Sequence, residues 1–182
     1  AETWGGDGPE LVRSIEPGLW VTATPDMLET AFENLIDNAH GFSPPGRRLA
    51  VFQQSRFAPY FRQVREVVDS GVLGRIVLVK IRFNGFGRRW DWQTLRCNLG
   101  GSLFNTGPHA IDQALALIGW DRTPKVFCRM DCHHELGGDA DDFCSLTLYG
   151  KGLPTADILL TSCQAYPATH LYTIGGTRGS LV

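Results

Sequence analysis

Apolar and polar residues alternate most clearly between residues 75 and 83. Positions 77, 79, 81 and 83 are all apolar, whereas the positions between them pass from apolar to basic and end in Lys80 and Arg82. Because successive side chains of a strand point to opposite faces, this alternation predicts a strand with one face in the core. The other face of the predicted sheet is open unless a partner covers it.

The same alternation and its helical counterpart predict the remaining elements. Helical spacing of apolar residues predicts helices over residues 25–39 and 59–70, and a third helix that continues from the 100–112 run and ends at Gly119. Alternation predicts further strands over residues 49–53, 125–132, 142–149, 156–164 and 170–175. This order predicts an α+β fold, a mostly antiparallel open sheet with helices packed on one face.

Length and composition are those of one ordinary globular domain. The chain has 182 residues, of which 43% are hydrophobic and 20% charged, and this is enough to build a core. Residues 1–23 are rich in Gly, Pro and acidic groups and show no period. We therefore expect an irregular lead-in over residues 1–23 and one domain over residues 24–182.

Charge and cysteine content exclude several classes of function. The formal net charge is −2 and there is no long basic run, so we expect no nucleic-acid partner. No apolar stretch reaches the roughly 18 residues of a membrane span, so we expect no membrane partner. The five cysteines lack the spacing of a disulfide framework, which is typical of reduced thiols in a cytoplasmic protein.

The run over residues 100–112 concentrates polar chemistry in one short segment. Its glycines lead into Asn105, His109 and Asp112, which are separated by four and three residues. On a helix these spacings place side chains on one face, with Cβ atoms about 5–6 Å apart. A histidine between an amide and a carboxylate is a candidate general acid or base. The alternative is that His109 only forms a hydrogen bond within the core.

Two other clusters contain residue types that bind metals, but the predicted secondary structure does not favour a metal site at either. Cys128 and Cys132 stand near His133 and His134, but both cysteines fall at alternate positions of the strand predicted over 125–132. We therefore expect the two cysteines to be small core or half-buried residues.

The acidic residues Asp139, Asp141 and Asp142 are the second cluster. They immediately precede a predicted strand, so we interpret them as a turn rather than a cation site. No metal ligands are assigned.

Six short segments follow one another along the chain: residues 54–59 (QSRFAP), 71–76 (GVLGRI), 88–93 (RRWDWQ), 100–112 (GGSLFNTGPHAID), 138–143 (GDADDF) and 174–181 (IGGTRGSL). In this order and at these separations they resemble the C-terminal substrate-binding domain of the Gfo/Idh/MocA family of NAD(P)-dependent oxidoreductases. The resemblance implies the α+β fold predicted above. It also implies a homodimer or tetramer that forms through the open face of the sheet.

The activity implied by the resemblance is hydride transfer between the nicotinamide of NAD or NADP and a hydroxyl-bearing carbon of a sugar or polyol. By position in the motif, His109 is the implied base that takes the hydroxyl proton. Asn105 is implied to orient the substrate or the imidazole, and Asp112 to support the substrate site.

Three further residues are candidate substrate contacts. Arg56 lies between a predicted strand and a helix N-terminus, where loops carry ligands, and a surface salt bridge is the alternative. Arg89 and Trp90 lie in a predicted loop over residues 84–99, and the flat face of an indole packs on the C–H groups of a sugar. Trp92 lies in the same loop, where packing as a structural plug is the favoured alternative.

The sequence departs from the family at the cofactor-binding turn and at two positions of the substrate site. It has no Gly-x-Gly-x-x-Gly turn, and residues 15–18 hold a Glu and a Pro without the lysine of the family's Glu-Lys-Pro motif. Many members also have an aspartate where this chain has Asn105. Members of the family also usually continue with more strands beyond the segment matched by residues 174–181. The resemblance implies a fragment without the cofactor-binding domain, truncated at its C-terminus, that binds no cofactor itself, whereas its parent uses NAD or NADP. A non-catalytic module that senses a sugar or a dinucleotide is the alternative.

Overall fold

The computed structural model describes residues 53–87, 89–119, 123–133, 138–167 and 169–182. Residues Gln53–Val182 form one compact unit. The lead-in expected over 1–23, the helix expected over 25–39 and all but the last residue of the strand expected over 49–53 lie outside the described residues.

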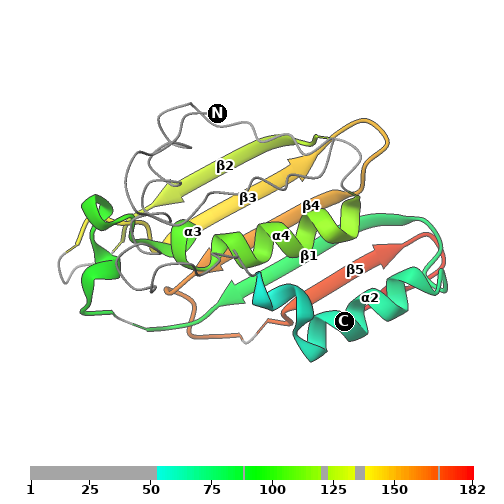
Figure 1. Cartoon of the computed structure of the whole chain (residues 1–182), viewed down its shortest axis with the longest axis horizontal. Coiled ribbons are helices and arrows are strands. Elements are labelled where there is room, and N and C mark those ends of the chain that lie inside the picture. The colour runs from blue at the N-terminus through cyan, green and yellow to red at the C-terminus, as the bar shows by residue number, and fades with distance from the viewer. Residues whose placement is uncertain (1–52, 88, 120–122, 134–137, 168) are drawn as a thin grey trace, which may run out of the picture. The chain divides into compact units, whose positions relative to one another are not determined.

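A six-stranded sheet in the order β2-β3-β4-β1-β5-β6 forms the centre of this unit (Figure 1). Its strands are β1 (Ile76–Asn84), β2 (Lys125–Asp131), β3 (Phe143–Tyr149), β4 (Thr155–Thr161), β5 (Tyr172–Gly176) and β6 (Ser180–Leu181). β1 and β4 pair in parallel, and the other neighbours pair antiparallel. The predicted mostly antiparallel α+β fold is therefore confirmed, with β6 as a short strand that the sequence pattern did not predict.

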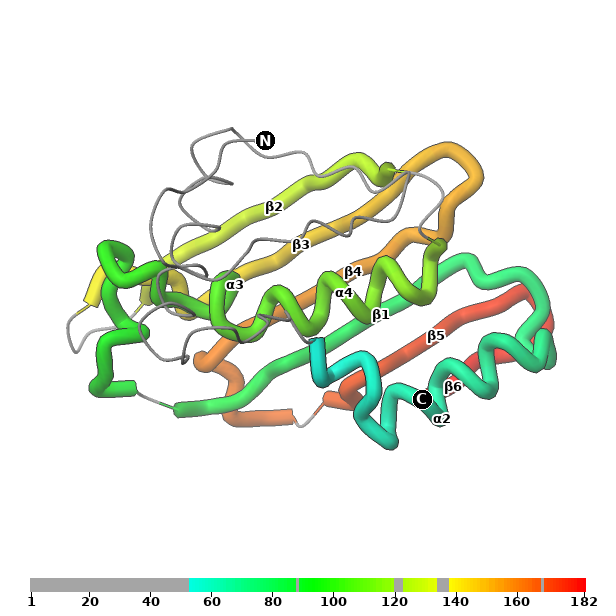
Figure 2. The backbone as a smooth tube through the Cα atoms, viewed as in Figure 1, coloured from blue at the N-terminus to red at the C-terminus, as the bar shows by residue number. Residues whose placement is uncertain are grey.

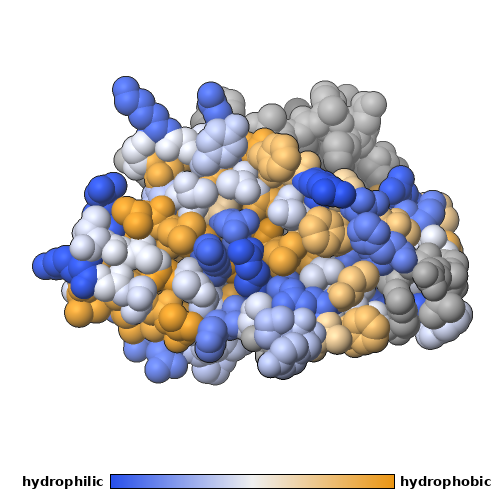
Figure 3. Space-filling view, turned by 180° about the vertical axis from the view of Figure 1, so that it is seen from behind, coloured by the Kyte–Doolittle hydropathy of each residue, from blue (hydrophilic) through white to orange (hydrophobic). Residues whose placement is uncertain are grey.

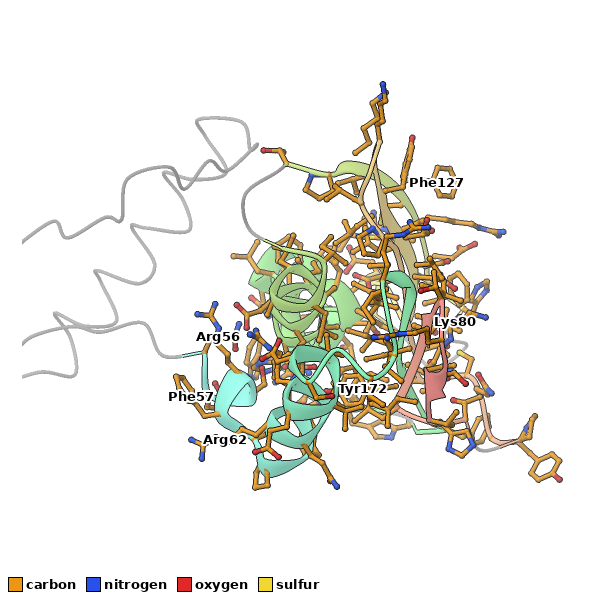
Figure 4. All side chains as sticks on the ribbon, turned by 90° about the vertical axis from the view of Figure 1, so that its right-hand side faces the viewer. Arg56, Phe57, Arg62, Lys80, Phe127 and Tyr172 are labelled. Carbon is orange, nitrogen blue, oxygen red and sulfur yellow. The ribbon has the colours of Figure 1, made fainter. Side chains whose placement is uncertain are left out.

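The helices all lie on one face of the sheet, as Figure 4 shows from the side. They are α2 (Pro59–Asp69), α3 (Ser102–Asn105) and α4 (Gly107–Ile118). The short 3₁₀ turn η1 (Gln54–Phe57) precedes α2, and η2 (Trp92–Thr94) and η3 (Arg96–Asn98) lie between β1 and α3. Helix α2 begins at Pro59, whose fixed φ suits the first turn. It ends before Gly71, where φ is +70°, a conformation that glycine adopts without strain.

The core fills the space between these helices and the sheet. Val79 and Ile81 of β1 are fully buried there, beside Phe61 of α2 and Ala114 of α4. The opposite side of β1 carries Arg82, whose Nη2 lies 2.6 Å from Asp157 Oδ2 on β4. The alternation seen in the sequence is therefore the division between a core face and an open face of the sheet.

The expected burial of Cys128 is wrong, whereas that of Cys132 is confirmed because Cys132 is half-buried. Cys128 is exposed, and Val126 and Met130 on the same side of β2 are 59% and 51% exposed. The reason is that β2 is an edge strand, while α4 packs over the central strands β1 and β4. The alternation of apolar and polar residues indicates the face of the sheet to which a side chain points. It does not indicate which strands a helix covers.

The face of the sheet turned away from the helices is named here the open face. Figure 3 shows it with hydrophobic and hydrophilic side chains intermixed. Phe127 on β2 is 62% exposed and Tyr149 on β3 is 42% exposed. Among the described residues, no helix is both long and apolar enough to cross a membrane.

Candidate functional site

The 100–112 run forms two helices rather than one, with α3 anchored at its first turn. Gly101 has φ +108° and ψ 166°, and a Cβ there would lie 2.2 Å from Asp141 Oδ1. The close approach lets Ser102 N–H donate to the Asp141 carbonyl at 2.8 Å and Leu103 N–H donate to Asp141 Oδ2 at 2.9 Å. Asp141 thereby satisfies donors that the start of a helix otherwise leaves unpaired.

His109 lies in the first turn of α4, four residues after Asn105, the last residue of α3. Its ring is half-buried, and Nδ1 lies 2.7 Å from Gln53 Oε1. The partner is therefore neither Asn105 nor Asp112, which the sequence spacing suggested. A polar contact and partial exposure distinguish this ring from one that is enclosed in an apolar core.

Gln53 and two residues of η1, Ser55 and Arg56, contact side chains of α4. We name these three contacts the η1 clamp. Besides the Gln53–His109 contact, the Arg56 guanidinium forms a bidentate ion pair with Asp112. Gln113 Nε2 donates to the Ser55 carbonyl at 3.1 Å. Figure 2 shows this cyan segment beside α4.

Arg56 forms a salt bridge, which is the alternative to a substrate contact that the sequence left open for it. The Asp112 side chain is only 11% exposed, so the pair joins the clamp to α4 at a largely buried carboxylate. Figure 4 places Arg56 on the outer side of the helical layer.

A cavity of about 150 Å³, lined by both apolar and polar residues, lies beside α3. Its walls come from the end of β1, the loop after it, α3 and the segments that flank β3 and β4. They include Arg89, Gln93, Ser102, Asn105, Asp141, Asp142 and Ser162. Two wall atoms, Gln93 Oε1 and Ser162 Oγ, are buried and have no hydrogen-bond partner among the described residues. Such atoms favour a ligand that offers donors and acceptors, since an unpaired buried polar atom costs free energy.

The predicted site residues divide between two neighbouring places. Asn105 and Arg89 line the cavity, whereas His109, Arg56 and Asp112 belong to the η1 clamp and do not line it. The two places meet where α3 passes into α4.

The loop tryptophans are at the surface. Trp90 is 75% exposed and Trp92 is 58% exposed, so the favoured interpretation of Trp92 as a structural plug is wrong. The physical reason is that the loop is held by polar contacts rather than by a buried indole. Arg89 Nη2 lies 3.0 Å from Asp91 Oδ2, and Asp91 Oδ1 accepts from Gln93 N–H at 2.9 Å. Arg89 and the Gln93 N–H together hold the pKa of Asp91 below its usual value.

Asp141 and Asp142 are cavity residues that sequence reasoning placed only in a turn. Asp142 is 1% exposed; its Oδ1 accepts from His133 N–H at 2.9 Å, and its Oδ2 lies 3.6 Å from Cys163 Sγ. The sequence held a signal for these cavity residues, because three acidic residues directly precede a predicted strand. Across the described ranges no group of three or more His, Cys, Asp or Glu side chains could hold a metal, and His134 lies outside them.

The described residues do not fit a dinucleotide. A pyrophosphate binds where free N–H groups at a glycine-rich turn open a helix. Here α3 is short and its first turn is already occupied by the Asp141 carboxylate. In α2 the Phe61 and Arg62 N–H groups donate to the Ala58 carbonyl, and in α4 the His109 and Ala110 N–H groups donate to the Thr106 carbonyl.

Known proteins share this domain. The family model of the GFO/IDH/MocA C-terminal domain matches residues 61–182. An uncharacterized oxidoreductase of Schizosaccharomyces pombe is 27% identical over 143 residues, which are 74% of this chain and 38% of that protein. The structure of an NAD-binding protein from Listeria innocua has a TM-score of 0.64 and 25% identity, covering 71% of this chain and 36% of that one.

A third comparison supports the fold alone. The structure of GenD2 from gentamicin A biosynthesis, in complex with NAD, has a TM-score of 0.59 and 22% identity, covering 70% of this chain and 37% of that one. The chain thus spans less than two-fifths of the length of each of these three proteins. Since the family model matches more than half of the chain, and does so across the sheet and both long helices, the chain belongs to the Gfo/Idh/MocA family and carries its C-terminal domain.

Proposed function

We propose that this chain is the substrate-binding part of an NAD(P)-dependent oxidoreductase that acts on a sugar or polyol. His109 is the base that takes the proton of the reacting hydroxyl while a hydride passes between the hydroxyl-bearing carbon and nicotinamide. The observation that carries the proposal is the half-buried imidazole of His109, held by a hydrogen bond and placed one helical turn from a cavity residue.

The cavity supports a polyhydroxylated substrate. The Asn105 amide offers both donors and an acceptor, Arg89 offers donors, and Gln93 Oε1 is a buried acceptor without a partner in the described part of the chain. A sugar or polyol hydroxyl donates and accepts at once, so it pairs with each of these groups. The exposed faces of Trp90 and Trp92 add a surface on which the C–H side of such a substrate packs.

The cofactor is proposed from the family and not from this chain's own residues. The Listeria innocua protein is an NAD-binding protein, and the structure of GenD2 is a complex with NAD. Because the described residues offer no pyrophosphate cradle, the nicotinamide is supplied by a part of the protein outside them. The part played by this chain is to bind and orient the substrate and to hold the proton at His109.

The proposal is tested by turnover in the full natural protein that carries this chain, supplied with NAD or NADP and a panel of sugars and polyols. His109→Gln lowers kcat by about 10²- to 10⁴-fold, the usual contribution of a positioned base. His170→Gln, at an exposed histidine that neither lines the cavity nor belongs to the η1 clamp, is the matched control and keeps wild-type kcat. An unchanged kcat in His109→Gln contradicts the proposal. A polyol that binds without nicotinamide reduction in any variant supports the ligand-sensing alternative instead.

We also propose that the open face of the sheet joins two copies of the chain in a homodimer or tetramer. Support comes from the exposed aromatic rings of Phe127 and Tyr149 on that face. On the same face Arg82 forms an ion pair with Asp157, and Lys80 lies opposite Asp157 in the strand register.

A further inference from the structure

We propose that Gln53 is a positioning residue that fixes the tautomer of His109, so that Nε2 is the nitrogen that receives the substrate proton. The inference rests on the function proposed above, in which His109 is the base. Gln53 lies immediately before η1, 56 positions from His109 in the sequence and outside the run that suggested the site.

The orientation of the Gln53 amide follows from its second partner. Gln53 Nε2 donates to the Pro108 carbonyl at 3.2 Å. Of the two ends of an amide, only the nitrogen can donate to a carbonyl oxygen. The oxygen, Oε1, is therefore the end that faces His109 Nδ1 at 2.7 Å.

The protonation of the ring follows from the amide. Gln53 Oε1 has lone pairs and no proton, so His109 Nδ1 must carry the hydrogen of this bond. A neutral imidazole has one N–H, and Nε2 then holds the free lone pair. A histidine side chain in water favours the opposite tautomer, with its proton on Nε2. Gln53 thus selects the form in which the nitrogen remote from the backbone is ready to accept a proton.

The η1 clamp keeps both partners of this bond in place. Pro108 and His109 are adjacent in the first turn of α4, so one amide contacts two consecutive residues. The Ser55 carbonyl and the Arg56 guanidinium join the same segment to α4 further along the helix. An amide also differs from a carboxylate in this position, because it orients the ring without a charge that would hold a second proton.

The test reads the tautomer directly by nitrogen NMR of the chain labelled with ¹⁵N-histidine, at a pH where the ring is neutral. The signals of His109 are assigned by their loss in His109→Gln. In the wild type we expect the hydrogen on Nδ1 and an unprotonated Nε2. Gln53→Leu removes the acceptor and shifts the tautomer ratio toward Nε2–H by about fivefold to tenfold, as the loss of one net hydrogen bond would.

Two further variants separate this role from a merely structural one. Gln53→Glu keeps an acceptor oxygen and is expected to keep the proton on Nδ1. Gln54→Leu changes the exposed neighbour on η1 and is expected to leave the ratio unchanged. If Gln53→Leu does not fold, the wild type and Gln53→Glu still decide the question.

A wild-type ring with its proton on Nε2 overturns the inference, and so does a Gln53→Leu ratio equal to that of the wild type. These measurements need neither substrate nor cofactor. The tautomer of His109 therefore decides the inference about Gln53, whereas the turnover of His109→Gln decides the proposed function.

Discussion

At the scale of single residues, the Gln113 side chain is a polar group with no exposed surface. Tyr172 Oη donates to Gln113 Oε1 at 2.7 Å, and Gln113 Nε2 donates to the Ser55 carbonyl. One buried amide thus connects β5, α4 and η1. A buried polar group that is fully paired costs little, but removing one partner exposes the desolvation cost of the other.

Tyr172→Phe is therefore expected to lower the free energy of unfolding by about 1–3 kcal/mol, because Gln113 Oε1 loses its donor. Denaturant unfolding of the chain measures the change. Tyr166→Phe is the matched control, since that ring is 87% exposed, and its effect should lie within about 0.5 kcal/mol. Equal effects of the two variants would show that the bond contributes nothing to stability.

The same hydroxyl gives a pH dependence with a definite sign. Burial raises the pKa of Tyr172 above its ordinary value of 10.0. Above pH 10 the unfolded chain loses this proton while the folded chain keeps it, so the free energy of unfolding falls as pH rises. The wild type should lose more stability than Tyr172→Phe between neutral pH and the region above pH 10. Parallel losses in the two proteins would contradict this origin.

Residue-level prediction from sequence was limited to neighbours in the chain. The spacing of Asn105, His109 and Asp112 predicted one helical face, whereas Asn105 ends α3 and His109 and Asp112 lie in α4. It could not identify Gln53 as the partner of His109, because that contact is set by how η1 packs on α4. Asp141 and Asp142 were recognised as a turn but not as cavity walls, since burial of a carboxylate depends on donors far along the chain.

At the scale of elements, the junction before α3 depends on a glycine. Gly101→Ala places a side chain at φ +108°, ψ 166°, a region that is almost confined to glycine, and against the Asp141 carboxylate. We expect a loss of about 1–3 kcal/mol in the free energy of unfolding, measured by thermal or denaturant unfolding. Gly85→Ala is the control, because a Cβ at Gly85 meets no atom within 4 Å. A Gly101→Ala protein as stable as Gly85→Ala would contradict the described junction.

The η1 clamp is a second element-level feature, and a double-mutant cycle measures its ion pair. Arg56→Ala and Asp112→Ala should couple by about 1 kcal/mol or more, since the pair is bidentate and its carboxylate is mostly buried. Arg65 and Asp69 on α2 form a matched exposed pair at 3.3 Å, for which we expect about 0.3–0.5 kcal/mol. A coupling no larger than that of the exposed pair would mean that Arg56 does not brace α4.

Element-level prediction from sequence located strands β1 to β5 and the helices α2 and α4 within a few residues. Its failure was at β2, where the alternation of Val126, Cys128 and Met130 indicated a core face. The side of the sheet was correct, but an edge strand lies beyond the helix that covers the centre. Whether a helix covers a given strand depends on how the helices and the sheet pack, and it cannot be predicted from the sequence of that strand alone.

At the scale of the whole molecule, the helices of the described unit lie on one face of the sheet (Figure 4), and we propose that the open face (Figure 3) joins a second copy of the chain. Phe127→Glu should convert an oligomer to a monomer, because it places a charge in the proposed interface. Light scattering coupled to gel filtration measures the mass. Phe57→Glu is the control on the helical side, where the ring is 50% exposed, and it should leave the mass unchanged. A wild-type chain that stays monomeric would refute the proposed use of the open face.

The architecture as a whole could be predicted because its signals are local: alternation, helical spacing and turn residues. The parallel pairing of β1 with β4 and the position of the cavity could not, because each brings together segments that lie far apart in the sequence. The family motifs identified the domain from the order of its segments. Which side chains contact one another depends on how η1, α3 and the loop after β1 pack.

The central claim, that His109 acts as a base, is tested most directly by chemical rescue. His109→Ala in the full natural protein removes the imidazole and leaves space where the half-buried ring lay. If the ring takes the substrate proton, turnover is lost and returns in proportion to the concentration of neutral imidazole added to the solution. Turnover that survives in His109→Ala, or that added imidazole does not restore in a folded variant, would contradict the account.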